Sequence, residues 1–381
     1  MPTNSLLIEN NALQPILKWA GGKEKELNYI IPNVPSFNNY YEPFVGGGSV
    51  FAAIKANKYS INDVSSELVS LYRNIASQNR KFYAFVEAID STWQNAYDFF
   101  CKHECLKIIY LSFRKEEISK EQLRNSIATF CLNNRTDISA IIDHSLKIDQ
   151  TILLTEFEQN LLRKFSRMKE LELKKNILPD NDLNDNIETA IKSAVYMTFR
   201  SEYNRRAKEN IDDEYYCALF LFIRNYCYSG MFRYNADGEF NVPYGGIAYN
   251  RKTMEKKLAY YKSKPLSLKF DKTSIYNLDF EQFLDTVNPT EDDFIFLDPP
   301  YDSEFSTYAQ NEFTRADQER LSNYLINECK AKWMMIIKYT DFIYGLYDKH
   351  GINIKSFDKE YLVSFMNRND KKATHLIITN Y

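Results

Sequence analysis

The segment that most constrains this chain is residues 294–301, where Phe-Ile-Phe-Leu runs directly into Asp-Pro-Pro-Tyr. Four consecutive apolar residues followed by a turn are typical of a strand that is buried on both faces of a sheet. Pro299 and Pro300 have no backbone N–H to donate to a neighbouring strand, so the strand ends before them. Asp298 therefore lies at the carboxyl end of a buried strand, which is the edge where open α/β sheets bind their ligands.

The N-terminal part of the chain repeats a pattern of strand, turn and helix. Residues 40–57 predict a strand, a triple-glycine turn and a helix. Residues 59–75 predict a second strand and a second helix, which is capped by Asp63 or Ser65. The same alternation returns after residue 251. Strands that alternate with helices predict a parallel sheet, so we expect an α/β fold with a doubly wound, Rossmann-like sheet.

The middle of the chain differs in character, because helical periodicity dominates there. We expect residues 1–75 and 251–381 to form one domain, and residues 76–250 to form an inserted, mostly helical domain. Within the insert, the polar and acidic stretch 177–190 predicts a loop between helices. An Asn-Ala-Asp-Gly sequence predicts the turn of a β-hairpin over about 228–245.

Composition sets broad limits on the class of protein. The 381 residues are 44% hydrophobic and 26% charged, as in ordinary globular proteins. No apolar run approaches the roughly 20 residues of a membrane span, and no signal peptide is recognised, so we expect a cytoplasmic protein without a membrane partner. The net charge of −3 neither favours nor excludes nucleic acid, whose binding needs only a local basic surface. No coiled-coil heptads are visible, so a monomer is expected.

The six cysteines are scattered along the chain. Cys101, His103 and Cys105 have the residue types of half a zinc site, but no second ligand pair follows at the spacing of a zinc finger. We therefore expect no metal, and free thiols in a reducing compartment.

The triple glycine at 46–48 has two interpretations. Glycines between a strand and a helix let a ligand approach the backbone at a helix N-terminus, but they also form plain tight turns. Asp63 ends the next strand, where a carboxylate suits the two hydroxyls of a ribose, although it could equally cap the following helix. Together, the glycine turn and Asp63 indicate a cofactor of the adenosine type. Residues 17–23, LKWAGGK, contain two lysines and a tryptophan. Taken without the other motifs, these residues are interpreted as solvated charges and a core aromatic residue.

Asp298 and the prolines suit chemistry on an exocyclic amine. The amino group of a nucleobase is a poor nucleophile, because its lone pair is delocalised into the ring. A carboxylate and the carbonyl of Pro299 could both accept from this amino group and favour an attacking geometry. Tyr301 would stack on the base, so positioning and electrostatic preorganisation would carry the reaction. The alternative is a proline-terminated strand with a surface aspartate.

Seven motifs of the chain resemble those of the Dam-type (D12 class) DNA adenine-N6 methyltransferases, which use S-adenosylmethionine. These motifs are LKWAGGK at 17–23, EPFVGGGSVF at 42–51, IND at 61–63, FRYNADGEFNVPYGG at 232–246, NLDF at 277–280, LDPPY at 297–301 and THLIITNY at 374–381. They stand in the family's order and reach both ends of the chain. Each is unspecific alone, but together they are highly specific.

The resemblance implies roles for the matching residues. S-adenosylmethionine would be bound by Trp19, Lys23, Phe44, Gly46, Asp63, Asp279, Phe280 and Asp298. Asp63 would bind the ribose, and Asp279 or Phe280 would lie near the adenine of the cofactor. The catalytic motif, which would hold the flipped target adenine, would consist of Asp298, Pro299, Pro300 and Tyr301.

The resemblance also makes the helical insert a target-recognition domain whose hairpin reads double-stranded DNA. Arg233 would read a guanine, assisted by Asn235 and Asn241. Tyr228 would wedge into the base stack, and Lys18 would touch DNA as well.

The chain departs from the family pattern in two places. Ser229 stands where the family usually has an asparagine before the hairpin glycine, and the helical insert is longer than in the short family members. Both departures concern recognition, so neither the target sequence nor the role of the long insert follows from the resemblance.

We therefore expect a site-specific, bacterial or phage-encoded DNA methyltransferase that acts on N6 of adenine in a restriction-modification system, alongside a separate cognate endonuclease. An N4-cytosine methyltransferase is the nearest alternative, because Asp-Pro-Pro-Tyr chemistry serves any exocyclic amine. An RNA methyltransferase is a weaker one, because the hairpin suits duplex grooves. A catalytically inactive DNA-binding specificity factor would predict a damaged catalytic motif, and residues 298–301 are intact.

Overall fold

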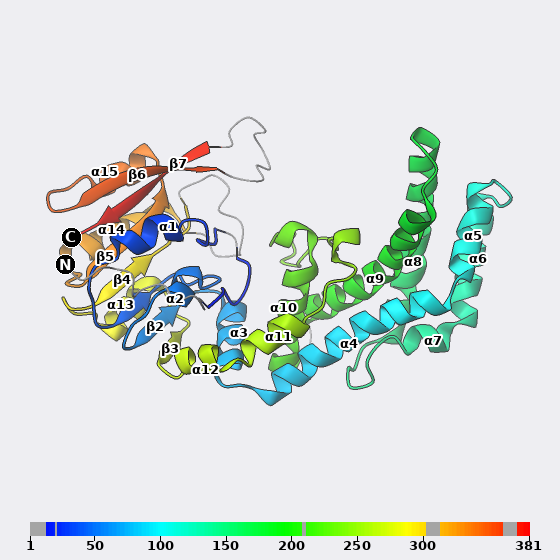
Figure 1. Ribbon diagram of the computed structural model, residues 1–381, viewed down its shortest axis with the longest axis horizontal. Coiled ribbons are helices and arrows are strands. Elements are labelled where there is room, and N and C mark those ends of the chain that lie inside the picture. The colour runs from blue at the N-terminus through cyan, green and yellow to red at the C-terminus, as the bar shows by residue number, and fades with distance from the viewer. Residues whose placement is uncertain (1–12, 20, 208–210, 302–312, 361–371) are drawn as a thin grey trace. The chain divides into compact units, whose positions relative to one another are not determined.

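The computed structural model of the chain describes residues 13–19, 21–207, 211–301, 313–360 and 372–381 (Figure 1). Residues 1–12, in which no signal peptide is recognised, lie outside the described residues. The chain divides into two compact units, one of Met1–Ser77 with Tyr261–Tyr381 and the other of Gln78–Tyr260. Across the described ranges, no helix combines the length and the apolar character that crossing a bilayer requires.

The first unit is built on one sheet. Over the described residues this sheet has seven strands in the order β3-β2-β1-β4-β5-β7-β6. The strands are β1 Tyr40–Glu42, β2 Tyr59–Asn62, β3 Thr273–Tyr276, β4 Phe294–Leu297, β5 Lys332–Lys338, β6 Asn353–Glu360 and β7 Lys372–Thr379. Strands β3, β2, β1, β4 and β5 run parallel, whereas β7 lies antiparallel between β5 and β6. The predicted α/β, Rossmann-like fold is confirmed, with an antiparallel pair at one edge that makes the sheet mixed.

The order of the strands reverses between β1 and β4. From β1 the chain moves outward through β2 to β3, and then returns to place β4 on the other side of β1. The crevice at the carboxyl ends of two such strands is the switch point where open α/β sheets bind ligands. The glycine turn follows β1 and Asp298 follows β4, so both predicted motifs lie at this switch point.

Helices cover the sheet of the first unit. They are α1 Leu27–Ile30, α2 Ser49–Ala53, α3 Ser66–Ala76, α12 Lys264–Phe270, α13 Phe280–Val287, α14 Arg315–Asn327 and α15 Asp341–Tyr347, with the short 3-10 helix η2 Ile31–Asn33. Phe283 on α13, Leu321 on α14 and Ile343 on α15 join one core cluster with Ile295 and Trp333 of the sheet. Strand β4 is buried over its whole length, as its four apolar residues predict.

The second unit is mostly helical, as expected of the insert. Its helices are α4 Arg80–Lys102, α5 Cys105–Arg114, α6 Lys120–Asn133, α7 Arg135–Ser139, α8 Gln150–Lys174, α9 Asp180–Asn204 and α10 Asp213–Tyr226, with the 3-10 helices η3 Arg205–Ala207, η4 Tyr228–Gly230 and η5 Ile247–Tyr249. Helix α11 Glu255–Tyr261 leads into the first unit. The ring of Trp93 on α4 lies 5.5, 4.7 and 5.4 Å from those of Phe222, Tyr226 and Tyr244. These aromatic contacts join α4, α10 and the end of the hairpin segment.

The prediction of a loop over 177–190 is wrong for most of its length, because α9 begins at Asp180. Pro179 stands at the N-cap, and Asp180 and Asp182 occupy the first turn, where the helix dipole stabilises negative charge. Leu183 and Ile187 are buried four residues apart, on one helical face. The acidic residues that suggested a loop therefore mark a helix start.

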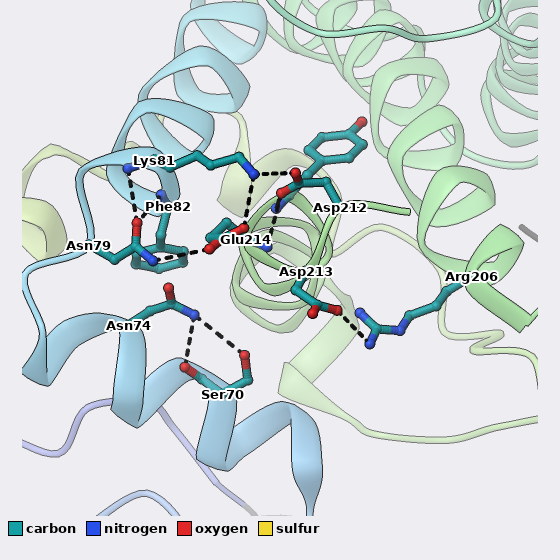
Figure 2. A network of polar contacts seen from close by, with 10 residues as sticks. Ser70, Asn74, Asn79, Lys81, Phe82, Arg206, Asp212, Asp213 and Glu214 are labelled. Carbon is teal, nitrogen blue, oxygen red and sulfur yellow. Dashed lines mark hydrogen bonds and ion pairs between the residues drawn. The ribbon is translucent and has the colours of Figure 1, made fainter. Parts of the chain in front are cut away.

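Polar contacts tie the first turns of α4 and α10 together (Figure 2). Asn79 caps α4 and also donates from Nδ2 to Glu214 Oε1, at 3.3 Å. Lys81 Nζ lies 3.2 Å from Glu214 Oε2 and also pairs with Asp212, the N-cap of α10. Since the hairpin segment follows the C-terminal end of α10, this clamp helps to fix the helix that carries it.

The hairpin segment is present but irregular. Two isolated antiparallel bridges, Cys227–Tyr244 and Tyr234–Phe240, pair its two arms. The turn is closed by Asn235 N–H, which donates to Glu239 O at 2.9 Å, and by Gly238 with a φ of +76°. A positive φ is easily adopted by glycine, which explains the Gly in this turn.

Candidate active site

The three glycines after β1 are required by the packing of the chain itself. A Cβ on Gly47 would lie 2.3 Å from the carbonyl oxygen of Leu17, and a Cβ on Gly48 would lie 2.4 Å from the Tyr72 hydroxyl. Gly46 and Gly48 have φ values of +50° and +77°, which side chains with a Cβ rarely adopt. The glycine turn is thus pressed between the N-terminal segment and α3, and α2 begins immediately after it.

Asp63 is tied to the glycine turn. Its Oδ2 accepts from Gly46 N–H at 3.0 Å, and its Oδ1 accepts from Ser65 N–H at 3.0 Å. Ser65, and not Asp63, is the N-cap of α3 and accepts from Leu68 N–H. Burial raises the pKa of Asp63, and the backbone N–H groups oppose this rise. Because each carboxylate oxygen offers more than one lone pair, Asp63 can still accept from ligand hydroxyls.

Asn62 locks the neighbouring segments in place, and its role was not predicted. Its side-chain amide donates to the carbonyls of Pro43 and Leu278, both at 3.0 Å, and accepts from Leu278 N–H at 2.9 Å. Asn62 is only 1% exposed. It therefore joins the segment after β1 to the segment after β3. An asparagine at the end of a predicted strand was the sequence signal that could have identified it.

Lys23 contacts the Asp-Pro-Pro-Tyr motif. Its ammonium pairs with the Asp298 carboxylate and donates to the Tyr301 hydroxyl at 3.2 Å and to Gly21 O at 2.9 Å. The side chain of Lys23 is 3% exposed and that of Asp298 is 20% exposed. Two motifs that are 275 residues apart in the sequence thus meet at the end of β4.

Two further side chains contact the motif, and sequence reasoning missed both. Gln318 on α14 donates from Nε2 to Pro300 O at 2.7 Å. The ring of buried His375 on β7 lies 5.5 Å from the Tyr301 ring, in an edge-on arrangement. His375 lies within the THLIITNY motif, but neither residue type nor spacing assigned it a role.

An aromatic cluster lies beside the glycine turn. The rings of Phe44, Phe280 and Phe313 are 5.6 to 5.7 Å apart, centre to centre. Phe313 was not predicted here. Asp279 caps α13 by accepting from Glu281 N–H at 3.0 Å.

The carboxylate of Asp279 is paired with a cation. Arg320 donates to Asp279 Oδ2 at 2.9 Å, and its guanidinium lies 4.7 Å from the centre of the Phe280 ring. The hydrogen bond to Asp279 and the surrounding acidic residues raise the pKa of Arg320, although burial opposes this rise. Asp279 is therefore held by its own helix and by α14.

Trp19 lies against the glycine turn, since its Cδ1 would be 2.9 Å from a Cβ on Gly46. The structure thus brings together, within the first unit, Trp19 with Gly46 and Asp63, Phe44 with Phe280, and Lys23 with Asp298 and Tyr301. Within the described residues, no three His, Cys, Asp or Glu side chains are grouped so that they could hold a metal ion.

Two buried ionisable side chains, Glu42 and Lys269, lie near the end of β1 and the end of α2. Glu42 at the end of β1 accepts from the Tyr40 hydroxyl at 2.8 Å, and burial raises its pKa well above the usual value. Lys269 donates to Ile54 O at 2.6 Å and stacks over the Tyr59 ring at 4.1 Å. Burial lowers the pKa of Lys269 to about 7.

Four of the five residues expected to touch DNA lie in the second unit, and Lys18 lies exposed in the first. Arg233 is exposed and donates from Nε to Asn241 Oδ1 at 2.9 Å, across the hairpin. Asn235 Oδ1 accepts from the backbone N–H groups of Asp237 and Glu239, at 3.1 and 2.8 Å, so this oxygen shapes the turn.

Tyr228 is 50% exposed and begins the hairpin segment. Its neighbour Ser229 has a φ of +54°. Asparagine adopts this left-handed conformation more readily than serine does, so the departure from the family pattern falls on a position with an unusual backbone.

Comparison with known proteins points to one family. The sequence profile described as "D12 class N6 adenine-specific DNA methyltransferase" matches residues 19–191 and 171–363. A type II methyltransferase, M.CviBI, of a Paramecium bursaria Chlorella virus is 26% identical over 377 residues, which cover 97% of this chain and 100% of the relative. A type II methyltransferase, M.MjaIII, of Methanocaldococcus jannaschii is 24% identical over 97% of this chain and 99% of its own length. The DNA adenine methylase of Escherichia coli is 24% identical over 80% of this chain and 73% of its own length.

Proposed function

The chain belongs to the D12 class of N6 adenine-specific DNA methyltransferases, and from this premise we propose that it methylates N6 of an adenine flipped out of a specific sequence in double-stranded DNA. The observation that carries the proposal is the contact of Lys23 with Asp298 and Tyr301 at the switch point of the sheet. This contact presents a carboxylate and an aromatic ring together, at the edge where a ligand binds.

The chemistry at this edge follows from the residues present. The Asp298 carboxylate and the carbonyl of Pro299 both accept hydrogen bonds from the amino group of the target adenine. These bonds draw the lone pair of the amino nitrogen toward the attacking geometry. Lys23 holds the carboxylate of Asp298 in one orientation, so little reorganisation is needed at the moment of reaction. Tyr301 supplies a ring on which the extruded base stacks.

The residues beside the glycine turn fit S-adenosylmethionine, which supplies an electrophilic methyl group when it is bound. Asp63 is fixed by two backbone N–H groups and can accept from both ribose hydroxyls. The aromatic cluster of Phe44, Phe280 and Phe313 offers apolar surface for an adenine ring. The set proposed for the cofactor is Trp19, Lys23, Phe44, Gly46, Asp63, Asp279, Phe280 and Asp298.

The helical unit is proposed to recognise the target. Arg233 on the hairpin, steadied by Asn241, presents a guanidinium of the kind that pairs with guanine. Half-exposed Tyr228 is proposed to enter the base stack, and Lys18 to contact DNA from the first unit. Asn235 is proposed to assist through the turn that it shapes.

A role in restriction-modification is proposed because two of the relatives are named type II methyltransferases. The protein would act as a monomer in the cytoplasm of a bacterium or a phage-infected cell. A separate endonuclease that cuts the same sequence would be its functional partner, without a stable complex.

The decisive experiment is expression in a bacterium that lacks DNA methylation, followed by sequencing that reads modified bases directly. We expect N6-methyladenine in one short sequence. N4-methylcytosine would transfer the proposal to the cytosine amine. DNA binding without any modification would identify an inactive specificity factor.

A further inference from the structure

The Asp-Pro-Pro-Tyr turn cannot be held by the usual backbone bonds of a sheet edge. Strand β4 ends at Leu297, and the two residues after Asp298 are prolines, which have no N–H to donate. The turn must therefore be oriented through its carbonyl oxygens and its side chains. Lys23 supplies one such contact, to the side chains at the two ends of the turn.

Gln318 supplies another contact, to the middle of the turn. It lies in the first turn of α14, whose start is fixed by a capping box between Thr314 and Asp317. Its Nε2 donates to Pro300 O at 2.7 Å. Because a carbonyl oxygen can only accept, the chemistry requires the nitrogen of the amide to face Pro300 and fixes the orientation of the side chain.

Gln318 is an energetically unfavourable residue at this position in the core. It is 1% exposed, and its Oε1 has no hydrogen-bond partner in the part of the chain that the structure describes. A buried amide oxygen without a partner is destabilising. Leu321 and Leu325 occupy the same face of α14 and belong to the apolar core. Packing alone would favour an apolar side chain at position 318.

The peptide plane that begins at Pro300 O also contains the backbone nitrogen of Tyr301. Holding this oxygen therefore sets the direction in which Tyr301 leaves the turn. Lys23 holds the hydroxyl of the same side chain. The ring of Tyr301 is thus fixed at its root by Gln318 and at its tip by Lys23.

From this geometry we infer that Gln318 is a positioning residue, which holds the Pro300 carbonyl and so aims the ring of Tyr301 at the target base. The inference rests on the proposed function of the Asp298–Tyr301 turn. Gln318 itself touches neither the base nor the cofactor in this account. Its amide is retained in an apolar core because it orients the motif.

The test compares Gln318→Met, which keeps most of the volume but has no donor, with Gln318→Glu, which replaces the donor by an acceptor. We expect both variants to methylate DNA roughly tenfold to hundredfold more slowly in a single turnover. The dissociation constant for S-adenosylmethionine should change less than about twofold, and the melting temperature of Gln318→Met should equal or exceed that of wild type, since a buried unpaired oxygen is removed. The control is Ser322→Ala, which removes a buried hydroxyl one helical turn later that donates to Glu319 O within α14 at 2.9 Å; it should keep the wild-type rate.

A second readout is the fluorescence of 2-aminopurine at the methylated position, which rises when the base is flipped and falls when it stacks on an aromatic ring. Higher 2-aminopurine fluorescence in the DNA complexes of the Gln318 variants than in the wild-type complex would support the inference, because it would indicate that Tyr301 no longer stacks on the base. Wild-type single-turnover rates in both variants would overturn the inference, and so would a rate loss fully explained by unfolded protein. The variant Asp298→Asn distinguishes a failure of this inference from a failure of the proposed function. If Asp298→Asn is inactive and Gln318→Met is normal, only this inference fails. An active Asp298→Asn rejects the proposed chemistry.

Discussion

Two turns leave neighbouring strands at the same edge of the sheet, and they are held in opposite ways. The glycine turn after β1 is held through its own backbone groups: Gly46 N–H donates to the Asp63 carboxylate, Gly46 O accepts from the Tyr72 hydroxyl at 3.0 Å, and Gly47 O accepts from Ile16 N–H at 2.9 Å. The Asp-Pro-Pro-Tyr turn after β4 is held by the side chains of Lys23 and Gln318.

This difference indicates that the first turn contributes mainly to the stability of the fold and the second mainly to activity. A turn that is pressed against the backbone of other segments cannot change without disturbing the fold. A turn that is held by long side chains can lose its alignment while the sheet and its core persist. Substitutions in the first turn should therefore reduce stability, and substitutions in or around the second should reduce turnover.

The largest effect is expected from Asp298→Asn. The amide oxygen can still accept from Lys23, so the buried ammonium keeps a partner, but the charge that draws on the adenine amine is lost. We expect kcat to fall by roughly 10²- to 10³-fold, with a free energy of unfolding within about 1 kcal/mol of wild type. Methyl transfer to DNA and urea unfolding measure the two quantities. Turnover close to wild type would break the proposed role of the second turn.

Next in size is Gly47→Ala in the first turn. The added Cβ would lie 2.3 Å from the backbone oxygen of Leu17, which cannot move without displacing the main chain. We expect a loss of about 3 kcal/mol in the free energy of unfolding, measured by urea titration. The matched control is Gly345→Ala in α15, where a Cβ meets nothing within 4 Å, and which should be neutral or stabilising by up to about 1 kcal/mol. Equal stability of the two variants would contradict the steric account.

Lys23→Met sharpens the comparison, because Lys23 belongs to the set proposed for the cofactor and also contacts the catalytic motif. If its main role is to align Asp298 and Tyr301, kcat should fall by roughly 10- to 100-fold, a larger change than that in the affinity for S-adenosylmethionine. Isothermal titration calorimetry measures the affinity for S-adenosylmethionine, and single-turnover assays measure the rate of methyl transfer. Lys25→Met, an exposed lysine two residues later, is the control. A large rise in the dissociation constant with normal kcat would instead show that Lys23 serves the cofactor alone.

The smallest effect concerns Lys269, which is buried against the end of α2 and the Tyr59 ring of β2. Its folded pKa is lowered to about 7 by burial. The unfolded chain then binds a proton that the folded chain has lost, so Lys269 makes the free energy of unfolding rise with pH from about 7 toward the usual lysine value. The slope is at most about 1.4 kcal/mol per pH unit.

Unfolding of wild type and Lys269→Met at pH 7 and pH 8 tests this contribution. We expect wild type to gain about 1 kcal/mol relative to the variant over this interval. The raised pKa of Glu42 acts in the opposite direction, and it remains in the variant. Parallel pH profiles for the two proteins would show that Lys269 stays charged in the folded protein, as it is in the unfolded chain.

Much of the site was predictable because its signals are local. The prolines end β4 at Leu297 whatever the rest of the chain does. The strand before the glycines and the helix after them followed from residue type and spacing. The error over residues 177–190 has the same local origin: acidic residues and a proline favour both loops and helix starts, and only the buried pair Leu183 and Ile187 distinguishes them.

By itself, the sequence determined the family, the α/β fold with its helical insert and the two turns at the sheet edge, because strand ends and turns depend on neighbours a few residues away. Only the tertiary structure decided which side chains hold the second turn. Lys23 reaches Asp298 across 275 residues, and Gln318 reaches Pro300 from a separate helix. These contacts exist because the strand order places β4 beside β1 and α14 packs on the sheet, and a side chain's partner across such a distance is set by that packing and not by local pattern.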